Sequence, residues 1–352
     1  MELPVQKKRY DGIDGLRAFG AVGIVIMHVL SNFSWLLEGV VFKTIIPSFT
    51  NFVYLFMVIS GFSLCCGYYE KVKDGTISWG AFYKKRFAKV WPLFAFLCVC
   101  EFVLSPKLET LYDVFMNCTM VFGLIPNYRP EVIGVGWFLG VVFVFYFVFP
   151  FFCSLLEKQW KAWGAFGISI LITVLLERYY FLPSYTGIED FYARRNFIYC
   201  APFFLAGGLI YLYRDAIARF VKKFWYVMIA ICAGTVAFYY LVDRPLVGSL
   251  LISVAFLCLA IGIEWKGLLN NPVTKFLGNI SMEIYLCHML AFRILLLLKL
   301  NRLFSNYLLS YICMCVMTLA LTIGLALAFR YGMVLAKRLI KKLFFKEKIT
   351  QE

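Results

Sequence analysis

The chain contains only two histidines, His28 and His288, and each lies inside a long apolar segment. Ionisable groups are costly inside a bilayer, so an imidazole in such a segment is a candidate functional group. A neutral imidazole, whose ordinary pKa is about 6.5, can remove a proton from a hydroxyl or carry a transferred group covalently. A hydrogen bond to a neighbouring helix is the structural alternative for each histidine.

The first histidine shares a helix face with two charged residues. Arg17 precedes His28 by eleven residues. At about 100° per residue the two side chains lie on nearly the same face, roughly 16 Å apart along the axis. Asp14 is one turn before Arg17 and can form an ion pair with it. Asp14, Arg17 and His28 thus share one polar stripe, and a simple interfacial ion pair is the alternative for the two charged residues.

The second histidine lies on a similar polar stripe. Ser281, Tyr285 and His288 fall at i, i+4 and i+7, which places all three side chains on one helix face. Glu283 points elsewhere. A hydroxyl, a phenol and an imidazole on one line can shape a substrate site, and interhelical hydrogen bonding is the alternative.

A third group is the basic segment 82–92, which contains Lys84, Lys85, Arg86 and Lys89. Arg86 and Lys89 are one turn apart at the start of a predicted helix. Clustered basic side chains of this kind can hold the phosphates of a cofactor. The alternative is a patch that records membrane topology and attracts anionic lipid.

Other catalytic and metal-binding patterns do not occur in the sequence. There is no Walker loop, no G-x-S-x-G motif and no H-E-x-x-H motif. The 12 cysteines are scattered, mostly within apolar runs, and their spacing fits neither a zinc site nor a disulfide framework. We expect the cysteines to be packing residues, and we expect no metal.

The elements that position these residues must be membrane helices. The 352 residues are 62% hydrophobic and 16% charged, with a mean hydropathy of +0.80, whereas soluble domains are about half apolar and a quarter charged. We predict an all-α polytopic membrane bundle forming one domain over 1–352. A span needs about 20 mainly apolar residues. Ten stretches qualify: 13–33, 47–67, 89–105, 136–156, 162–180, 197–213, 225–241, 246–264, 277–298 and 307–334.

The distribution of basic residues gives the orientation. The formal charge is +15, and with ten spans and an internal N-terminus, 23 of the 35 basic residues fall in inner segments and eight in outer ones. If 110–125 were a further span, every later segment would change sides and its basic clusters would fall on the outer side. We therefore predict an interfacial or re-entrant element at 110–125. Both termini are then cytoplasmic, the N-terminal segment is a retained span, and 337–352 is a short basic tail. Topology explains most of the positive charge, so we expect no nucleic-acid partner.

Several motifs resemble one known family. The segment 11–18, DGIDGLRA, with His28 completing an R-x10-H spacing, resembles the first helix of the membrane acyltransferase-3 family, which includes bacterial O-acetyltransferases of cell-surface polysaccharides. Similar motifs follow in the same order along nearly the whole chain: FMVISGF at 56–62, RFAKVWP at 86–92, GWFL at 136–139 with Tyr146 and Pro150, and GNISMEIYLCH at 278–288.

Two positions depart from the family pattern. The second arginine of the basic R-x-x-R loop is Lys89 here, which keeps the charge and loses a bidentate grip. Many members also carry a glutamate where this chain has Val142. The branch with WFL often lacks that acid, so we expect activity to be retained.

The resemblance implies a multi-pass enzyme of the bacterial cell membrane. It implies an acyl-CoA donor on the cytoplasmic side, with acetyl-CoA expected, and a carbohydrate hydroxyl as acceptor on the outer side. The alternative is a membrane transporter or flippase for a glycan precursor, since in-membrane polar groups could also line a path. A purely structural subunit is disfavoured by the two polar stripes. Neither the acyl group nor the oligomeric state follows from the sequence.

The resemblance also implies roles for the residues already identified. His28 is expected to be the catalytic residue, and Arg17 to hold the donor or to fix Asp14. The expected donor-phosphate ligands are Arg86, Lys89 and Lys85. The residues expected to shape the site are Ser281, Tyr285, His288 and Trp137. The residues expected to meet the acceptor are Glu189, Asp190, Arg194 and Arg195.

Overall fold

The computed structural model describes residues 10–104, 106–125, 132–182, 192–242, 245–263 and 267–349. Glu189 and Asp190, predicted to meet the acceptor, and the basic residues 7–9 lie outside these ranges. Within them the chain is helical, with turns and short loops between helices and no β-strand. The predicted all-α fold class is confirmed.

The chain forms two compact units. The first unit comprises Met1–Gly20 and Thr50–Asn279, and the second comprises Ala21–Phe49 and Ile280–Glu352. The first helix, α1 (Asp11–Ser31), contributes its beginning to the first unit and its end to the second. Arg17 therefore belongs to the first unit and His28 to the second.

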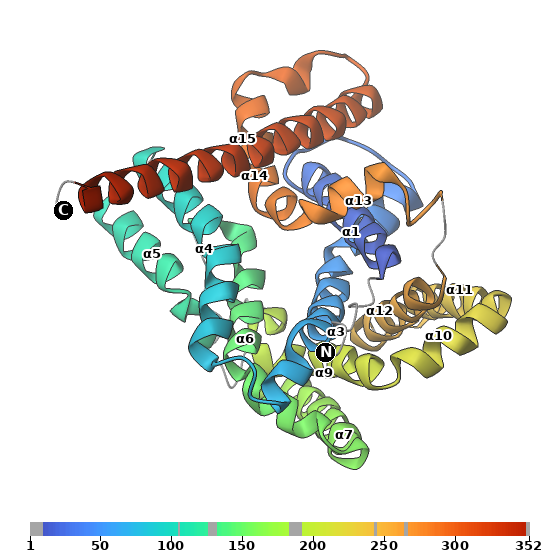
Figure 1. The fold of residues 1–352 in the computed structure, drawn as a ribbon. Helices are drawn as coiled ribbons and strands as arrows, with labels where there is room; N and C mark the ends of the chain where they lie inside the picture. Colours follow the sequence, from blue (N-terminus) through green and yellow to red (C-terminus); the bar gives the residue numbers. More distant parts are fainter. Residues whose placement is uncertain are drawn as a thin grey trace. The chain divides into compact units, whose positions relative to one another are not determined.

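The first unit is built around α3 (Phe52–Lys73), which packs against α6, α9 and α12 (Figure 1). The contact between α3 and α9 is close because both helices carry glycine. A Cβ added at Gly61 would lie 2.4 Å from the carbonyl oxygen of Phe204, and one at Gly207 would lie 2.2 Å from that of Val58. Small residues of this kind let membrane helices approach closely. The other elements of the unit are η2 (Phe49–Asn51, shared at Phe49), α4 (Trp79–Leu104), α5 (Leu108–Thr119), η3 (Val121–Leu124), η4 (Gly134–Gly136), α6 (Trp137–Leu156), α7 (Gln159–Leu175), η5 (Leu176–Tyr180), η6 (Ala193–Arg195), α9 (Phe197–Leu212), α10 (Arg214–Lys223), α11 (Trp225–Leu241), α12 (Pro245–Gly262) and α13 (Pro272–Asn279).

The second unit contains the end of α1 and the two helices α14 (Ser281–Leu297) and α15 (Tyr307–Ile349), which lie side by side (Figure 1). The Tyr311 hydroxyl of α15 donates to the Ile26 carbonyl of α1 at 3.0 Å. The Trp35 indole donates to the Val29 carbonyl at 2.8 Å and packs against Tyr311. These contacts hold the end of α1 against α15. The short elements of the unit are η1 (Val41–Ile45), α2 (Ile46–Ser48) and η7 (Leu300–Arg302).

Many of the helices are suited to cross a membrane. By length and composition, six described helices could span one, and eight could if two sharply bent pairs each count as one span. The remaining predicted spans, 89–105 and 225–241, lie on α4 and on the 17-residue helix α11. Each of the ten predicted stretches therefore falls on a helix. The stretch 277–298 is not one continuous helix, because the chain leaves helical geometry at Ile280, after the weak helix formers Gly278 and Asn279.

The segment 110–125 does not form a membrane span. It folds as the 12-residue helix α5 followed by the short η3, and 12 residues of α-helix extend only about 18 Å, against the roughly 30 Å of a bilayer core. α5 packs along α4 and η3 along α6. At the other end of the chain, the predicted basic tail continues α15 to Ile349.

Candidate active site

The two histidines meet within the second unit. His288 Nε2 lies 3.1 Å from His28 Nδ1, and the two ring centroids are 4.8 Å apart. His288 is only 1% exposed, whereas His28 is half-buried. Each ring also contacts the carbonyl four residues earlier in its own helix: His28 Nδ1 at 3.1 Å from Ile24 O, and His288 Nδ1 at 3.2 Å from Ile284 O. The end of α1 and the start of α14 thus form a histidine pair.

These contacts assign the tautomers of the pair. A carbonyl oxygen only accepts hydrogen bonds, so His288 Nδ1 carries the hydrogen that it donates to Ile284 O. Neutral His288 then has its lone pair on Nε2 and accepts a hydrogen bond from His28 Nδ1–H. His28 therefore carries its lone pair on Nε2. That atom can take a proton or form a covalent bond without any change in the hydrogen bonds at Nδ1.

The rest of the α14 stripe lies beside the pair. Tyr285 and Ser281 are buried, and the Tyr285 ring centroid is 6.0 Å from that of His288. Glu283 points away from this face, as its spacing predicts, and its carboxylate accepts hydrogen bonds at 2.6 Å from the Nε and Nη2 atoms of Arg330 on α15. This ion pair fastens α14 to α15 two residues from Tyr285. The partner could not be predicted from the spacing because Arg330 lies 47 residues away.

Arg17 is fixed within the first unit. Its Nη1 lies 3.5 Å from the Asp14 carboxylate, so the predicted ion pair forms, and its Nη2 donates to the Ser63 hydroxyl of α3 at 2.9 Å. The backbone of α13 packs tightly here, because a Cβ at Gly278 would lie only 2.2 Å from the Asp14 carbonyl oxygen. Ser63 carries no motif or charge that would have marked it in the sequence.

Arg86 is held between two tyrosines of neighbouring helices. Its Nη2 donates to the Tyr68 hydroxyl at 2.6 Å, and its guanidinium carbon lies 4.7 Å from the Tyr68 ring centroid and 5.9 Å from that of Tyr146, on α6. Arg86 Nε is buried and makes no hydrogen bond in the described part of the chain.

The other predicted phosphate ligands lie on the same helix as Arg86 and are more exposed. Lys85 and Lys89 are exposed on α4, while Arg86 points inward. The basic segment therefore contributes one inward cation, and its lysines extend the positive charge at the surface. Tyr68 was not identified in the sequence, and Tyr146 was noted there only as part of a motif.

A separate polar cluster surrounds Trp137, at the start of α6. Arg194 of η6 lies with its guanidinium carbon 5.3 Å from the Trp137 ring centroid, and its Nη1 donates to the Thr50 hydroxyl at 2.8 Å. The Arg195 guanidinium lies 4.4 Å from the centroid of the Tyr192 ring. The structure thus gathers Trp137 with Arg194, two residues predicted for different parts of the site. Within the described ranges, no three His, Cys, Asp or Glu side chains are placed to bind a metal ion.

The comparisons with known proteins agree with the motifs. Residues 10–327 match the family described as an acyltransferase domain, Acyl_transf_3. The chain belongs to this acyltransferase-3 family. It is also 28% identical over 127 residues to "Protein 2 in picA locus" of Rhizobium radiobacter, a match that covers 34% of this chain and 62% of that relative. No solved structure matches the chain.

Family membership confirms the coarse part of the sequence prediction. The chain is a multi-pass membrane protein of the acyltransferase-3 family. The motif positions that carried the resemblance fall on α1, α3, α4, α6 and α13–α14, and these elements contain the histidine pair, Arg17 and Arg86.

Proposed function

We propose that the protein transfers an acyl group, acetyl in the first instance, from a cytoplasmic acyl-CoA to a hydroxyl of a cell-surface or exported carbohydrate. We place it in the bacterial cell membrane with both termini in the cytoplasm, as the distribution of basic residues favours. The observation that carries the proposal is the histidine pair, in which His288 holds His28 with its lone pair on Nε2.

In this proposal His28 Nε2 acts as the general base. It removes the proton of the acceptor hydroxyl while the hydroxyl oxygen attacks the thioester carbonyl. The carbon–sulfur bond then breaks, and the CoA thiolate leaves with the proton from the His28 imidazolium. The products are the O-acyl carbohydrate and free CoA. The His28 imidazolium is stabilised because its Nδ1–H still donates to His288.

A covalent route uses the same atom. The Nε2 lone pair attacks the thioester first, CoA leaves, and the acyl group then passes from Nε2 to the carbohydrate hydroxyl. An acyl-histidine trapped with acetyl-CoA in the absence of acceptor distinguishes this route from direct transfer.

We assign the donor phosphates to Arg17 and Arg86. Both guanidinium groups are anchored by hydroxyl groups, and the unpartnered Nε of Arg86 supplies a further donor for a phosphate oxygen. Guanidinium groups are suited to this role because their planar donors match phosphate oxygens. Lys85 and Lys89 would raise the local concentration of an anionic donor from the surface.

The acceptor is assigned to the cluster at Trp137. An aromatic ring beside an arginine, as at Trp137 and Arg194, offers a flat apolar face and hydrogen-bond donors to a sugar. Ser281 and Tyr285 would shape the site around the histidine pair.

The test is mass analysis of surface glycans from cells with and without the gene. The proposal predicts a glycan that gains one acyl mass only when the gene is present. A glycan whose mass is unchanged but whose amount at the surface depends on the gene would instead indicate a transporter or flippase.

A further inference from the structure

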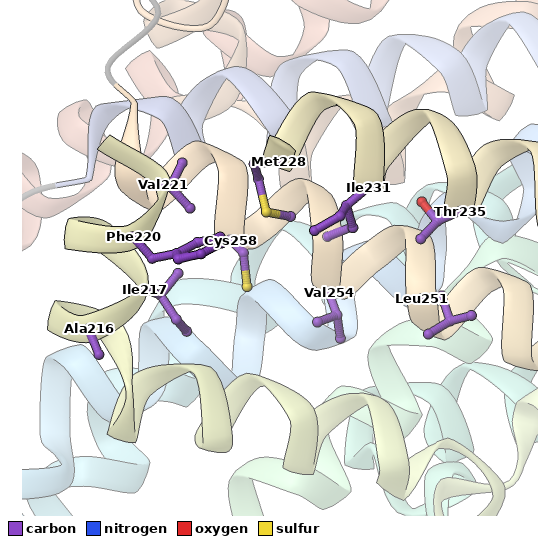
Figure 2. Close-up of a pocket in the computed structure, with 11 residues that line it drawn as sticks. Ala216, Ile217, Phe220, Val221, Met228, Ile231, Thr235, Leu251, Val254 and Cys258 are labelled. Atoms are coloured by element: carbon purple, nitrogen blue, oxygen red, sulfur yellow. The ribbon is translucent and has the colours of Figure 1, made fainter. Parts of the chain in front are cut away.

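A groove between α10, α11 and α12 of the first unit lies outside the clusters described above (Figure 2). Its volume is about 430 Å³, within the range of about 300–1,000 Å³ that small-molecule pockets occupy. Side chains from all three helices point into it, including Phe220, Ile231 and Val254. The one hydroxyl in the lining, on Thr235, already donates to the Cys232 carbonyl at 2.8 Å. The groove therefore suits an apolar chain that forms no hydrogen bonds.

The helix that borders the groove has the character of a membrane-interface element. α9 is an apolar span candidate, and α10 follows it at a bend of 76°. The ten residues of α10 carry four basic side chains and one acidic side chain. Trp225 and Tyr226, which begin α11, are exposed. Basic amphipathic helices and exposed aromatic residues are both typical of the membrane–water boundary.

The apolar face of α10 is anchored to α12. Val221 is fully buried, and a Cβ added at Gly262 would lie 2.3 Å from the Val221 Cβ. The groove is therefore lined by a helix that is packed closely onto α12.

Only one of the four basic side chains of α10 contacts a carboxylate within the described residues. Arg214 is within 4.0 Å of the Asp215 carboxylate. Arg219 and Lys222 are exposed and contact no carboxylate in the part of the chain that the structure describes, and Lys223 lies over the Phe224 ring at 5.0 Å. At about 100° per residue, Arg219 and Lys223 flank the edge of the groove formed by Ala216 and Phe220, whereas Lys222 lies on the opposite face of α10.

We propose that the groove holds one acyl chain of an anionic phospholipid, with the headgroup bound by Arg219 and Lys223. Charge complementarity selects this occupant: an anionic headgroup neutralises the two cations, and its attached chain fills the apolar groove. A second copy of the chain docking here through the same surface would bring two basic α10 helices together, which like-charge repulsion opposes. The proposal does not depend on the acyl-transfer function, since neither the histidine pair nor Arg17 or Arg86 lines the groove.

The experiment is a lipid titration of the purified full chain in detergent, followed by native mass spectrometry. The probes are dioleoyl-phosphatidylglycerol and dioleoyl-phosphatidylcholine, which share their acyl chains and differ in charge. We expect one phosphatidylglycerol to bind with a lower Kd than phosphatidylcholine. The double variant Arg219→Gln, Lys223→Gln should weaken phosphatidylglycerol binding about 30-fold, because each basic side chain near an anionic lipid contributes about 1 kcal/mol. The matched control, Lys71→Gln with Lys73→Gln at the end of α3, should leave the Kd unchanged.

A second pair of variants tests the groove itself. Val254→Trp should fill the groove and abolish binding of both lipids. If Val254→Trp fails to fold, Leu251→Trp is the substitute, because Leu251 lies at a more exposed position on the edge of the groove. It should also abolish binding of both lipids. Unchanged lipid binding in a folded variant of either kind would show that the chain lies elsewhere. Equal Kd values for the two lipids would refute the headgroup assignment, and a dimer that excludes lipid would identify a second copy as the occupant.

Discussion

The role of His288 can be tested by replacing it with phenylalanine. His288 accepts a hydrogen bond from His28 Nδ1 at 3.1 Å and is itself held by Ile284 O. When His28 takes the acceptor proton, this bond becomes a charge-assisted one, which typically contributes about 1.5–3 kcal/mol. Its loss should therefore lower kcat about 10- to 150-fold. Ile24 O still orients the His28 ring, so the loss should be partial, unlike the loss expected for His28→Ala.

The assay is release of free CoA thiol from acetyl-CoA by membrane vesicles supplied with the surface glycan, normalised to the amount of enzyme. We expect the KM for acetyl-CoA to be unchanged, because the donor residues proposed here lie elsewhere. His288→Gln should recover part of the rate, since its side-chain oxygen can accept the same hydrogen bond. Wild-type kcat in His288→Phe would refute the reasoning, and a loss as complete as that of His28→Ala would show that His288 itself reacts.

Three further predictions concern residues outside the histidine pair. Arg86→Ala should raise the KM for acetyl-CoA. Arg86→Lys should bring the KM only part of the way back to the wild-type value, because the planar guanidinium fork is lost. An unchanged dependence of the rate on acetyl-CoA concentration would count against the donor assignment. Gly278→Ala should lower the free energy of unfolding by about 1–3 kcal/mol, and with it the thermal midpoint, since the added Cβ would clash with a backbone carbonyl of α1. At Gly80 an added Cβ meets open space, so Gly80→Ala should leave the midpoint unchanged. Glu283→Gln should also lower the midpoint by removing the negative charge that pairs with Arg330, and an unaltered melting curve would show that the pair is dispensable.

The helices themselves were predictable because hydropathy reports membrane burial directly. Each predicted span falls on a helix, and the single-face placement of Ser281, Tyr285 and His288 follows from helical geometry alone. The break at Ile280 was not predicted, since an apolar run of the right length gives no signal where a chain bends inside it.

The contacts between helices were less predictable. His28 and His288 lie 260 residues apart, and their spacing on separate helices carries no information on which atoms meet. The basic segment was recognised, but its composition could not show that Arg86 turns inward to Tyr68 while Lys85 and Lys89 remain exposed. Which basic side chain of α4 turns inward depends on how α4 packs against α3, and the order of charges along the sequence does not encode that packing.

The catalytic role of His28 is tested most directly by the acylation of surface glycans in cells that carry His28→Ala in place of the wild type, measured by mass spectrometry at matched protein levels in the membrane. We expect normal membrane insertion and a glycan that lacks the added acyl mass. A fully acylated glycan in the His28→Ala cells would show that His28 is not the catalytic residue.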